Sequence, residues 1–293
     1  MLLQIALLSL HRMIDSMLGD YRILDKLAET GMGILHTARS QRTGRDVTVE
    51  VLHPSVASKP DAIIRFSEGA RALARMVHPG IVAILDYDEV DGKVFMVLEP
   101  LRGDSLATRL ELGPMPVKQA VDIVRQLAEA LGAAHEFGVV HRDLKPQNVF
   151  LISDPDTATG ERVKVLDFSL ATMPEQRETV VTGEDYLLGT PTYMAPEQGS
   201  DIVDIDHRAD LYSLGCILYE LLCGMPPFGR GGLEVLAAHL SDEPPPLRTR
   251  APSVSPALEA VAMRLLAKNP DERYPSCDSL ITALDRVAPS SRS

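Results

Sequence analysis

Residues 141–148 read HRDLKPQN, and this stretch decides the fold assignment because two further short motifs follow it in order. An Asp-Phe-Ser triplet occupies residues 167–169, and an Ala-Pro-Glu triplet occupies residues 195–197. Very few sequence families combine these three motifs in this order. The three motifs together therefore predict both the fold and the position of a functional site.

Length, charge and cysteine content limit the number of domains and the kinds of partner that the chain can have. With 293 residues, the chain can form one large or two medium domains around a sizeable core. Its formal net charge of -12 argues against nucleic acid or an anionic membrane as the main partner, because these ligands attract clustered Lys and Arg. Cys216, Cys223 and Cys277 lack paired metal-ligand spacing, which favours reduced thiols in a cytoplasmic protein.

The ends of the chain differ from the rest. Residues 1–10 are nearly all apolar, but a bilayer span takes about 20 residues, and a signal peptide would need a positive flank and a cleavage site. We predict an N-terminal tail (1–16), a folded domain (17–288) and a C-terminal tail (289–293). A translation artefact and a short packed helix are the alternatives for residues 1–16. No other apolar run reaches membrane length, so we expect no membrane partner.

The hydrophobic pattern predicts strands first and helices second. Alternating apolar residues indicate strands most clearly at 47–52, 81–87 and 94–99. One helix, at about residues 60–76, interrupts them. Long helices are predicted afterwards, at 117–137 and at 209–223, and the second is apolar around most of its circumference and should be buried. This segregation predicts an α+β protein with two lobes and a ligand cleft between them.

From about residue 20 to residue 287, the chain resembles the bacterial eukaryotic-type Ser/Thr protein kinases, on the three motifs quoted above. The resemblance implies the two-lobed protein kinase fold. The small N-lobe (17–99) would be an antiparallel sheet with one main helix, and a hinge (99–103) would lead to a larger, mainly helical C-lobe (104–288).

The resemblance also implies the chemistry of phosphoryl transfer, which depends mainly on positioning and charge stabilisation. In the family pattern Asp143, Lys145 and Asn148 are catalytic. Asp143 accepts the proton of a substrate hydroxyl and Lys145 neutralises the transferring phosphate, while Asn148 and Asp167 hold Mg²⁺. ATP and Mg²⁺ are the implied cofactors, and Ser or Thr side chains of proteins are the implied substrates.

Nucleotide binding is implied for the N-lobe and the hinge. The Glu99 carbonyl and the Leu101 N–H would bind the edge of adenine, with Leu98 as the gatekeeper beside them. The other implied nucleotide-binding positions are Gly31, Gly33, Leu35 and Glu50.

Other matched positions would brace the fold or regulate it. The resemblance implies a buried ion pair between Glu197 and Arg273, and it implies that Asp210 holds the backbone of the catalytic loop. Thr179 and Thr182 are candidates for phosphorylation. Ordinary loop threonines are the alternative interpretation of both.

The chain departs from the family where the phosphates would bind. Glu50 stands where the family keeps a phosphate-binding lysine, and Gly69 stands where a glutamate pairs with that lysine. Replacing a cation by an anion exchanges attraction to a phosphate for repulsion, and one unit-charge interaction at about 4 Å is worth about 4 kcal/mol at an effective dielectric of about 20. Because Arg65 lies one helical turn before Gly69, we hypothesise a charge-reversed contact between Glu50 and Arg65.

Smaller departures occur nearby. Ala28 and Thr30 occupy the first two glycine positions of the phosphate-binding loop, while the neighbouring Gly31 and the third glycine, Gly33, remain. Their side chains predict a loop that binds phosphate poorly or stands open. Thr48 replaces the small residue above adenine, and Ser169 replaces the glycine of the second motif.

Two functions from different classes follow. One is a pseudokinase or very weakly active kinase with a regulatory or binding role, favoured by Glu50, Gly69, Ala28 and Thr30. The alternative is an active ATP-dependent Ser/Thr protein kinase, favoured by Asp143, Lys145, Asn148 and Asp167. ATP binding without phosphotransfer is a variant of the pseudokinase interpretation. The pseudokinase is the interpretation that we favour.

Overall fold

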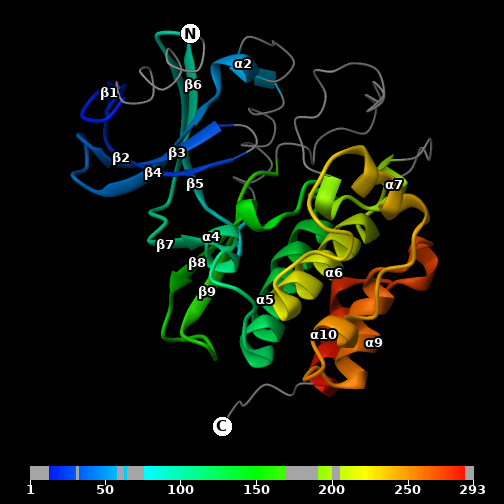
Figure 1. Cartoon of the computed structure of the whole chain (residues 1–293). Helices are drawn as coiled ribbons and strands as arrows, with labels where there is room; N and C mark the ends of the chain where they lie inside the picture. Colours follow the sequence, from blue (N-terminus) through cyan, green and yellow to red (C-terminus); the bar gives the residue numbers. More distant parts are fainter. Residues whose placement is uncertain are drawn as a thin grey trace. The chain divides into compact units, whose positions relative to one another are not determined.

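A computed structural model of the chain (Figure 1) describes residues 13–30, 33–57, 63–64, 76–168, 191–199 and 205–287. The chain divides into two units. The first contains residues up to 77 together with residues 82–102, and the second contains residues 78–81 and all residues from 103 onward. Among the described residues, none of the helices combines the length and the apolar character that crossing a membrane would require.

The first unit is built on a six-stranded antiparallel sheet with the strand order β1-β2-β3-β4-β6-β5. Its strands are β1 (Met17–Leu18), β2 (Tyr21–Glu29), β3 (Gly33–Ser40), β4 (Asp46–Leu52), β5 (Ile84–Val90) and β6 (Lys93–Leu98), and the short helix α2 (Pro54–Ala57) follows β4. The strand predicted to begin at Ile81 begins instead at Ile84. Ile81 belongs to the second unit, where it forms a parallel bridge with Val165.

The two faces of this sheet have different compositions. Successive side chains of a strand point to opposite faces. Val47, Val49 and Val51 of β4 belong to an apolar cluster that also contains Leu18, Tyr21, Ile23, Ala38, Phe95 and Val97. Thr48 and Glu50 alternate with these valines, so they lie on the opposite face.

Strands β3 and β4 approach closely at Gly33. A Cβ atom at this position would lie 2.3 Å from the carbonyl oxygen of Val51, which is far inside van der Waals contact. Only glycine therefore fits at the start of β3 without separating the two strands. The predicted helix at 60–76 falls largely outside the described residues.

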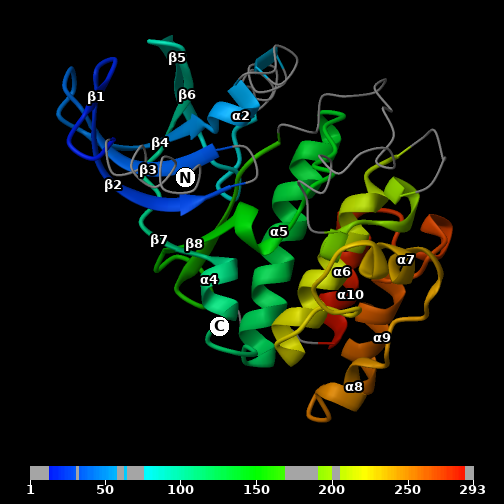
Figure 2. The same cartoon turned by 45° about the horizontal axis from the view of Figure 1, so that its top comes forward.

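The second unit combines a small antiparallel sheet with a helical bundle (Figure 2). Its sheet has the order β7 (Gly103–Ser105), β8 (Val149–Ser153) and β9 (Glu161–Val165). Its helices are α4 (Leu106–Leu110), α5 (Val117–Glu136), α6 (Arg208–Cys223), α7 (Leu233–Ser241), α8 (Leu247–Arg250), α9 (Pro256–Leu265) and α10 (Cys277–Val287).

Helix α6 is the centre of this bundle. It packs against α5 and α9, while α5 also packs against α10 (Figure 2). Nearly all of its residues are buried, as the apolar character of its whole circumference predicts. The helix ends at Gly224, whose φ of 80° is accessible to glycine at little cost. The predicted order of strands first and helices second is confirmed for the six-stranded sheet and the bundle, but the short strands β8 and β9 follow α5 and were not predicted as part of that order.

The ion pair predicted within the second unit is present. Arg273 donates two hydrogen bonds to the carboxylate of Glu197, at 2.6 and 2.7 Å, and both side chains are buried. Further donor groups of the guanidinium bind the backbone carbonyl oxygens of Ala267, Arg208 and Lys268. Such a pair is well satisfied, so removal of one partner would leave the other charge buried.

Candidate active site

The catalytic residues predicted from the HRDLKPQN stretch are brought together within the second unit. The loop follows α5, and residues 146–148 form a single 3₁₀ turn before β8. Lys145 Nζ lies 2.6 Å from Asp143 Oδ2, and Asn148 Nδ2 donates to the backbone carbonyl oxygen of Asp143 at 3.0 Å. Asn148 Nδ2 also lies 3.5 Å from Asp143 Oδ2, so the carboxylate has a cation and an amide beside it while its side chain keeps 33% exposure.

Asp210 at the start of α6 fixes the backbone of this loop. Its two carboxylate oxygens accept the backbone N–H groups of His141 and Arg142, each at 2.8 Å, and His135 Nε2 lies 2.8 Å away. Burial favours a higher pKa for Asp210, but the contacts with His135 and the loop outweigh it and hold that pKa below its ordinary value. These bonds hold Arg142 at a φ of 65°, a left-handed conformation that non-glycine residues adopt rarely.

His141, at the start of the HRDLKPQN stretch, is fully buried. Its ring lies 4.6 Å from the ring of Phe168, between centroids, and its Nε2 atom lies 3.0 Å from the carbonyl oxygen of Leu166. These contacts place the histidine between the catalytic loop and the segment that carries Asp167. The other ring nitrogen, Nδ1, lies 3.3 Å from the backbone N of Asp143, so both ring nitrogens are engaged within the protein.

Asn148 and Asp167 have the chemistry of a Mg²⁺ site. The N–H of Leu166 donates to the carbonyl oxygen of Asn148 at 2.9 Å, which keeps the two segments side by side. Among the described residues, Asn148 Oδ1 is a buried side-chain oxygen without a hydrogen-bond partner. Asp167 has a φ of 58°, a second left-handed conformation at this site. Mg²⁺ prefers oxygen ligands of this kind, so the two residues fit that ion.

The first unit brings together several of the predicted nucleotide-binding positions. Leu35 on β3 is the register partner of Glu50 on β4, and Thr48 is the partner of Leu98 on β6. Directly opposed residues of antiparallel strands point to the same face. Leu35, Glu50 and Leu98 therefore share the face opposite the apolar cluster.

Glu50 is buried and contacts the second departure from the family pattern. The hydroxyl of Thr30 donates to Glu50 Oε1 at 2.7 Å. The same hydroxyl accepts the N–H of Gly33 at 3.0 Å, and the Thr30 N–H donates to the carbonyl oxygen of Gly33 at 2.9 Å. The hydroxyl of Thr30 therefore ties the end of β2 to β4. The expectation of a loop that binds phosphate poorly or stands open stays a prediction, because residues 31–32 lie outside the described residues.

The expectation for Leu101 needs a correction. Its backbone N–H, predicted to be available to adenine, donates instead to Thr48 Oγ1 at 2.9 Å. The N–H of Glu99 bonds to the carbonyl oxygen of Ala83, and the N–H of Ala83 bonds to Glu99 Oε1. The sequence showed that Thr48 replaces the small residue expected above adenine. It did not predict the hydrogen bond that the threonine hydroxyl accepts from Leu101.

Some predicted positions lie outside the described residues. These are Gly31, Arg65, Gly69, Ser169, Thr179 and Thr182. The hypothesis of a contact between Glu50 and Arg65 therefore stays a prediction.

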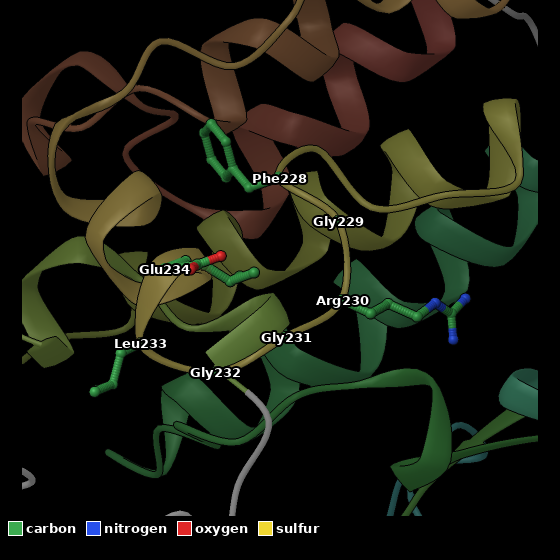
Figure 3. Close-up of a pocket in the computed structure, with 8 residues that line it drawn as sticks. Phe228, Gly229, Arg230, Gly231, Gly232, Leu233 and Glu234 are labelled. Carbon is green, nitrogen blue, oxygen red and sulfur yellow. The ribbon is translucent and has the colours of Figure 1, made fainter.

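A surface pocket elsewhere in the second unit is not part of the predicted site. Residues 228–235, at the start of α7, line a hollow of about 540 Å³ (Figure 3). Figure 3 shows Arg230 directed away from Glu234 and Leu233, and Arg230 pairs with Glu220 on α6. None of the predicted catalytic or nucleotide-binding residues lines this pocket.

Residues 21–283 match the protein kinase domain family, so the chain belongs to the protein kinases. It is 39% identical over 267 residues to the Ser/Thr-protein kinase Pkn1 of Myxococcus xanthus, and 38% identical over 273 residues to the Ser/Thr-protein kinase PknB of Mycobacterium leprae. Each alignment covers 91% of this chain but only 38% and 43% of the relatives. The chain therefore spans less than half the length of these curated relatives.

A solved structure of the same class shares the fold. The crystal structure of the Mycobacterium tuberculosis PknI kinase domain has a TM-score of 0.71 to this chain, with 27% identity, and covers 94% of this chain and 98% of that domain. The match confirms the two-lobed protein kinase fold. The relatives' names place the chain among the bacterial Ser/Thr kinases, a family that uses ATP and Mg²⁺ in general.

Proposed function

We propose that this chain is a regulatory or binding module of the Ser/Thr kinase family, with phosphotransfer that is absent or very weak. The observation that carries the proposal is the buried Glu50, on the face of the sheet that holds Leu35 and Leu98. A carboxylate there repels a triphosphate by about 4 kcal/mol, or roughly a thousandfold in affinity. The bond from Thr30 supports this role because it occupies the carboxylate with the chain's own hydroxyl.

The proposed module would bind a protein partner, in the cytoplasm, through a domain over residues 17–288. ATP would bind weakly or without transfer. Its site would be formed by Gly31, Gly33, Leu35, Glu50, Leu98, Glu99 and Leu101.

An active ATP-dependent Ser/Thr kinase is the second candidate, and the catalytic loop favours it. The contacts of Asp143 with Lys145 and Asn148 are those that phosphotransfer requires. In that reaction the substrate hydroxyl oxygen would form a bond to the γ-phosphorus, and the bond from that phosphorus to the bridging oxygen of ADP would break. Asp143 would take the hydroxyl proton.

Lys145 and the Mg²⁺ residues would complete this alternative. Lys145 would sit beside the transferring phosphate as a fixed cation. Mg²⁺, when bound, would neutralise phosphate charge, and Asn148 Oδ1 and the Asp167 carboxylate would hold it.

The two candidates are separated by transfer of labelled γ-phosphate from MgATP to the protein itself and to a basic protein acceptor. Asp143→Asn is the control. Signal no greater than that of the control supports the regulatory module. Transfer that Asp143→Asn abolishes would establish an active kinase and refute the proposal.

A double substitution tests whether the changes at residues 50 and 69 account for absent or weak phosphotransfer. Glu50→Lys with Gly69→Glu restores the family's ion pair. Transfer rescued by this variant would mean that the change at the phosphate site alone is responsible. A variant that folds but does not transfer phosphate would indicate a lobe rebuilt for another role.

A further inference from the structure

The hinge and strand β4 are joined by a hydrogen bond between residues far apart in the sequence. The N–H of Leu101 donates to Thr48 Oγ1 at 2.9 Å across 53 positions of the chain. The side chains of both residues are buried, with exposed fractions of 1% for Thr48 and 2% for Leu101. Neither group of this bond faces bulk water.

The strand register explains why Thr48 reaches this N–H. Thr48 is the β4 partner of Leu98, the last residue of β6, and the chain then continues from β6 toward Leu101. Thr48 therefore stands beside the segment that leaves the sheet. An alanine at the same position would have no oxygen to offer.

A second contact ties the same segment to β4. Arg102 Nη2 lies 2.9 Å from Asp46 Oδ2, and Arg39 pairs with the other oxygen of that carboxylate at 2.7 Å. Asp46 and Thr48 are two residues apart and share one face of the strand. Because Arg102 and Arg39 are exposed, these ion pairs contribute little, and the buried Thr48 bond is the stronger constraint.

We propose that Thr48 is an intrinsic competitor of base binding: its hydroxyl oxygen holds the backbone donor of the hinge, and a purine binds only when the Thr48–Leu101 bond breaks. The proposal rests on the nucleotide site proposed above, but not on whether the chain transfers phosphate. It makes Thr48 a residue that determines ligand specificity. The hinge would favour occupants that need no N–H donor from Leu101.

The expected size of the effect follows from this exchange of partners. A purine nitrogen that accepts from Leu101 replaces a hydrogen bond that already exists, so it gains no net bond at that atom. Removing the competing oxygen should strengthen purine binding by about tenfold, which corresponds to about 1.4 kcal/mol. The added space at position 48 acts in the same direction.

Adenosine is the appropriate probe because it carries no phosphate and so does not sense the charge of Glu50. Its affinity would be measured by calorimetry for the full chain, for Thr48→Ala and for Thr48→Ser, which keeps the hydroxyl. Thr37→Ala is the matched control. Thr37 lies directly opposite Thr48 on β3, and its own hydroxyl bond, to the carbonyl oxygen of Asp25, is long at 3.5 Å.

The proposal expects Thr48→Ala to bind adenosine about tenfold more tightly than the unaltered chain, while Thr48→Ser and Thr37→Ala remain close to it. Equal affinities of Thr48→Ala and the unaltered chain would overturn it. So would a gain in Thr48→Ser as large as that in Thr48→Ala, because space and not the hydroxyl would then decide. Absence of adenosine binding by every variant would overturn it as well.

Hydrogen exchange of the Leu101 amide gives a second test that needs no variant. In the unaltered protein without ligand, this amide should exchange slowly. Exchange at the rate of an exposed loop would refute the hydrogen bond and the proposal. Phosphotransfer, measured separately, would contradict the proposed function but leave both of these results interpretable.

Discussion

Substitution of Glu50 by glutamine removes one negative charge with little change in packing. Both side chains have the same length, and glutamine retains an Oε1 atom that can accept the hydroxyl of Thr30, now at 2.7 Å from Glu50. A phosphate group about 4 Å from this position would lose a repulsion of about 4 kcal/mol at an effective dielectric of about 20. Glu50→Gln is therefore expected to raise the affinity for ATP by up to about a thousandfold.

Calorimetric titration with ATP and with adenosine checks this expectation. Only ATP carries the phosphates, so its affinity should rise relative to that of adenosine, and the gain should shrink at high salt. Glu89→Gln, which neutralises an exposed carboxylate on β5, is the control and should change neither affinity. Equal gains for ATP and adenosine, or no gain for either, would refute the argument from the charge of Glu50.

Three further predictions concern stability. Arg273→Ala should lower the free energy of unfolding by about 3–5 kcal/mol in urea denaturation, because it leaves the Glu197 carboxylate buried without its partner; a loss below about 1 kcal/mol would contradict this. Burial lowers the pKa of His239 to about 4, so the unfolded chain binds more protons and stability should rise by about 3 kcal/mol between about pH 4 and 6.5. In thermal unfolding across this pH range, the stability of His239→Gln should rise less with pH than that of the unaltered chain. An equal dependence of stability on pH in the two proteins would exclude His239 as the source. Gly33→Ala should cost about 1–3 kcal/mol through the clash with the Val51 carbonyl oxygen, and an unchanged melting temperature would disprove that clash.

Much of the second unit could be predicted from the sequence. The burial of α6 follows from apolar residues around its whole circumference, and the HRDLKPQN stretch locates the loop that brings Asp143, Lys145 and Asn148 together. These features depend on residues close in the sequence or on a pattern that repeats along one element. They therefore need little knowledge of the rest of the fold.

The boundaries and contacts of the first unit were harder to predict. The strand predicted from Ile81 begins at Ile84, because Ile81 pairs with Val165 of the second unit and not with β6. Thr30 was expected in a loop that binds phosphate poorly or stands open, and the structure adds a hydrogen bond from its hydroxyl to Glu50, 20 residues away. The sequence identified Thr30 as a departure from the family pattern and contained no signal of the partner that its hydroxyl would find.

The amino-acid sequence by itself determined the family, the order of strands and helices, and the presence of a carboxylate where the family keeps a lysine. Only the tertiary structure decided that the hydroxyl of Thr48 would hold the N–H of Leu101. The physical reason is that a short side chain reaches only the groups that strand pairing places within about 3 Å of it. That pairing is a property of the whole sheet, because the register of each strand depends on the faces that all of its strands bury together.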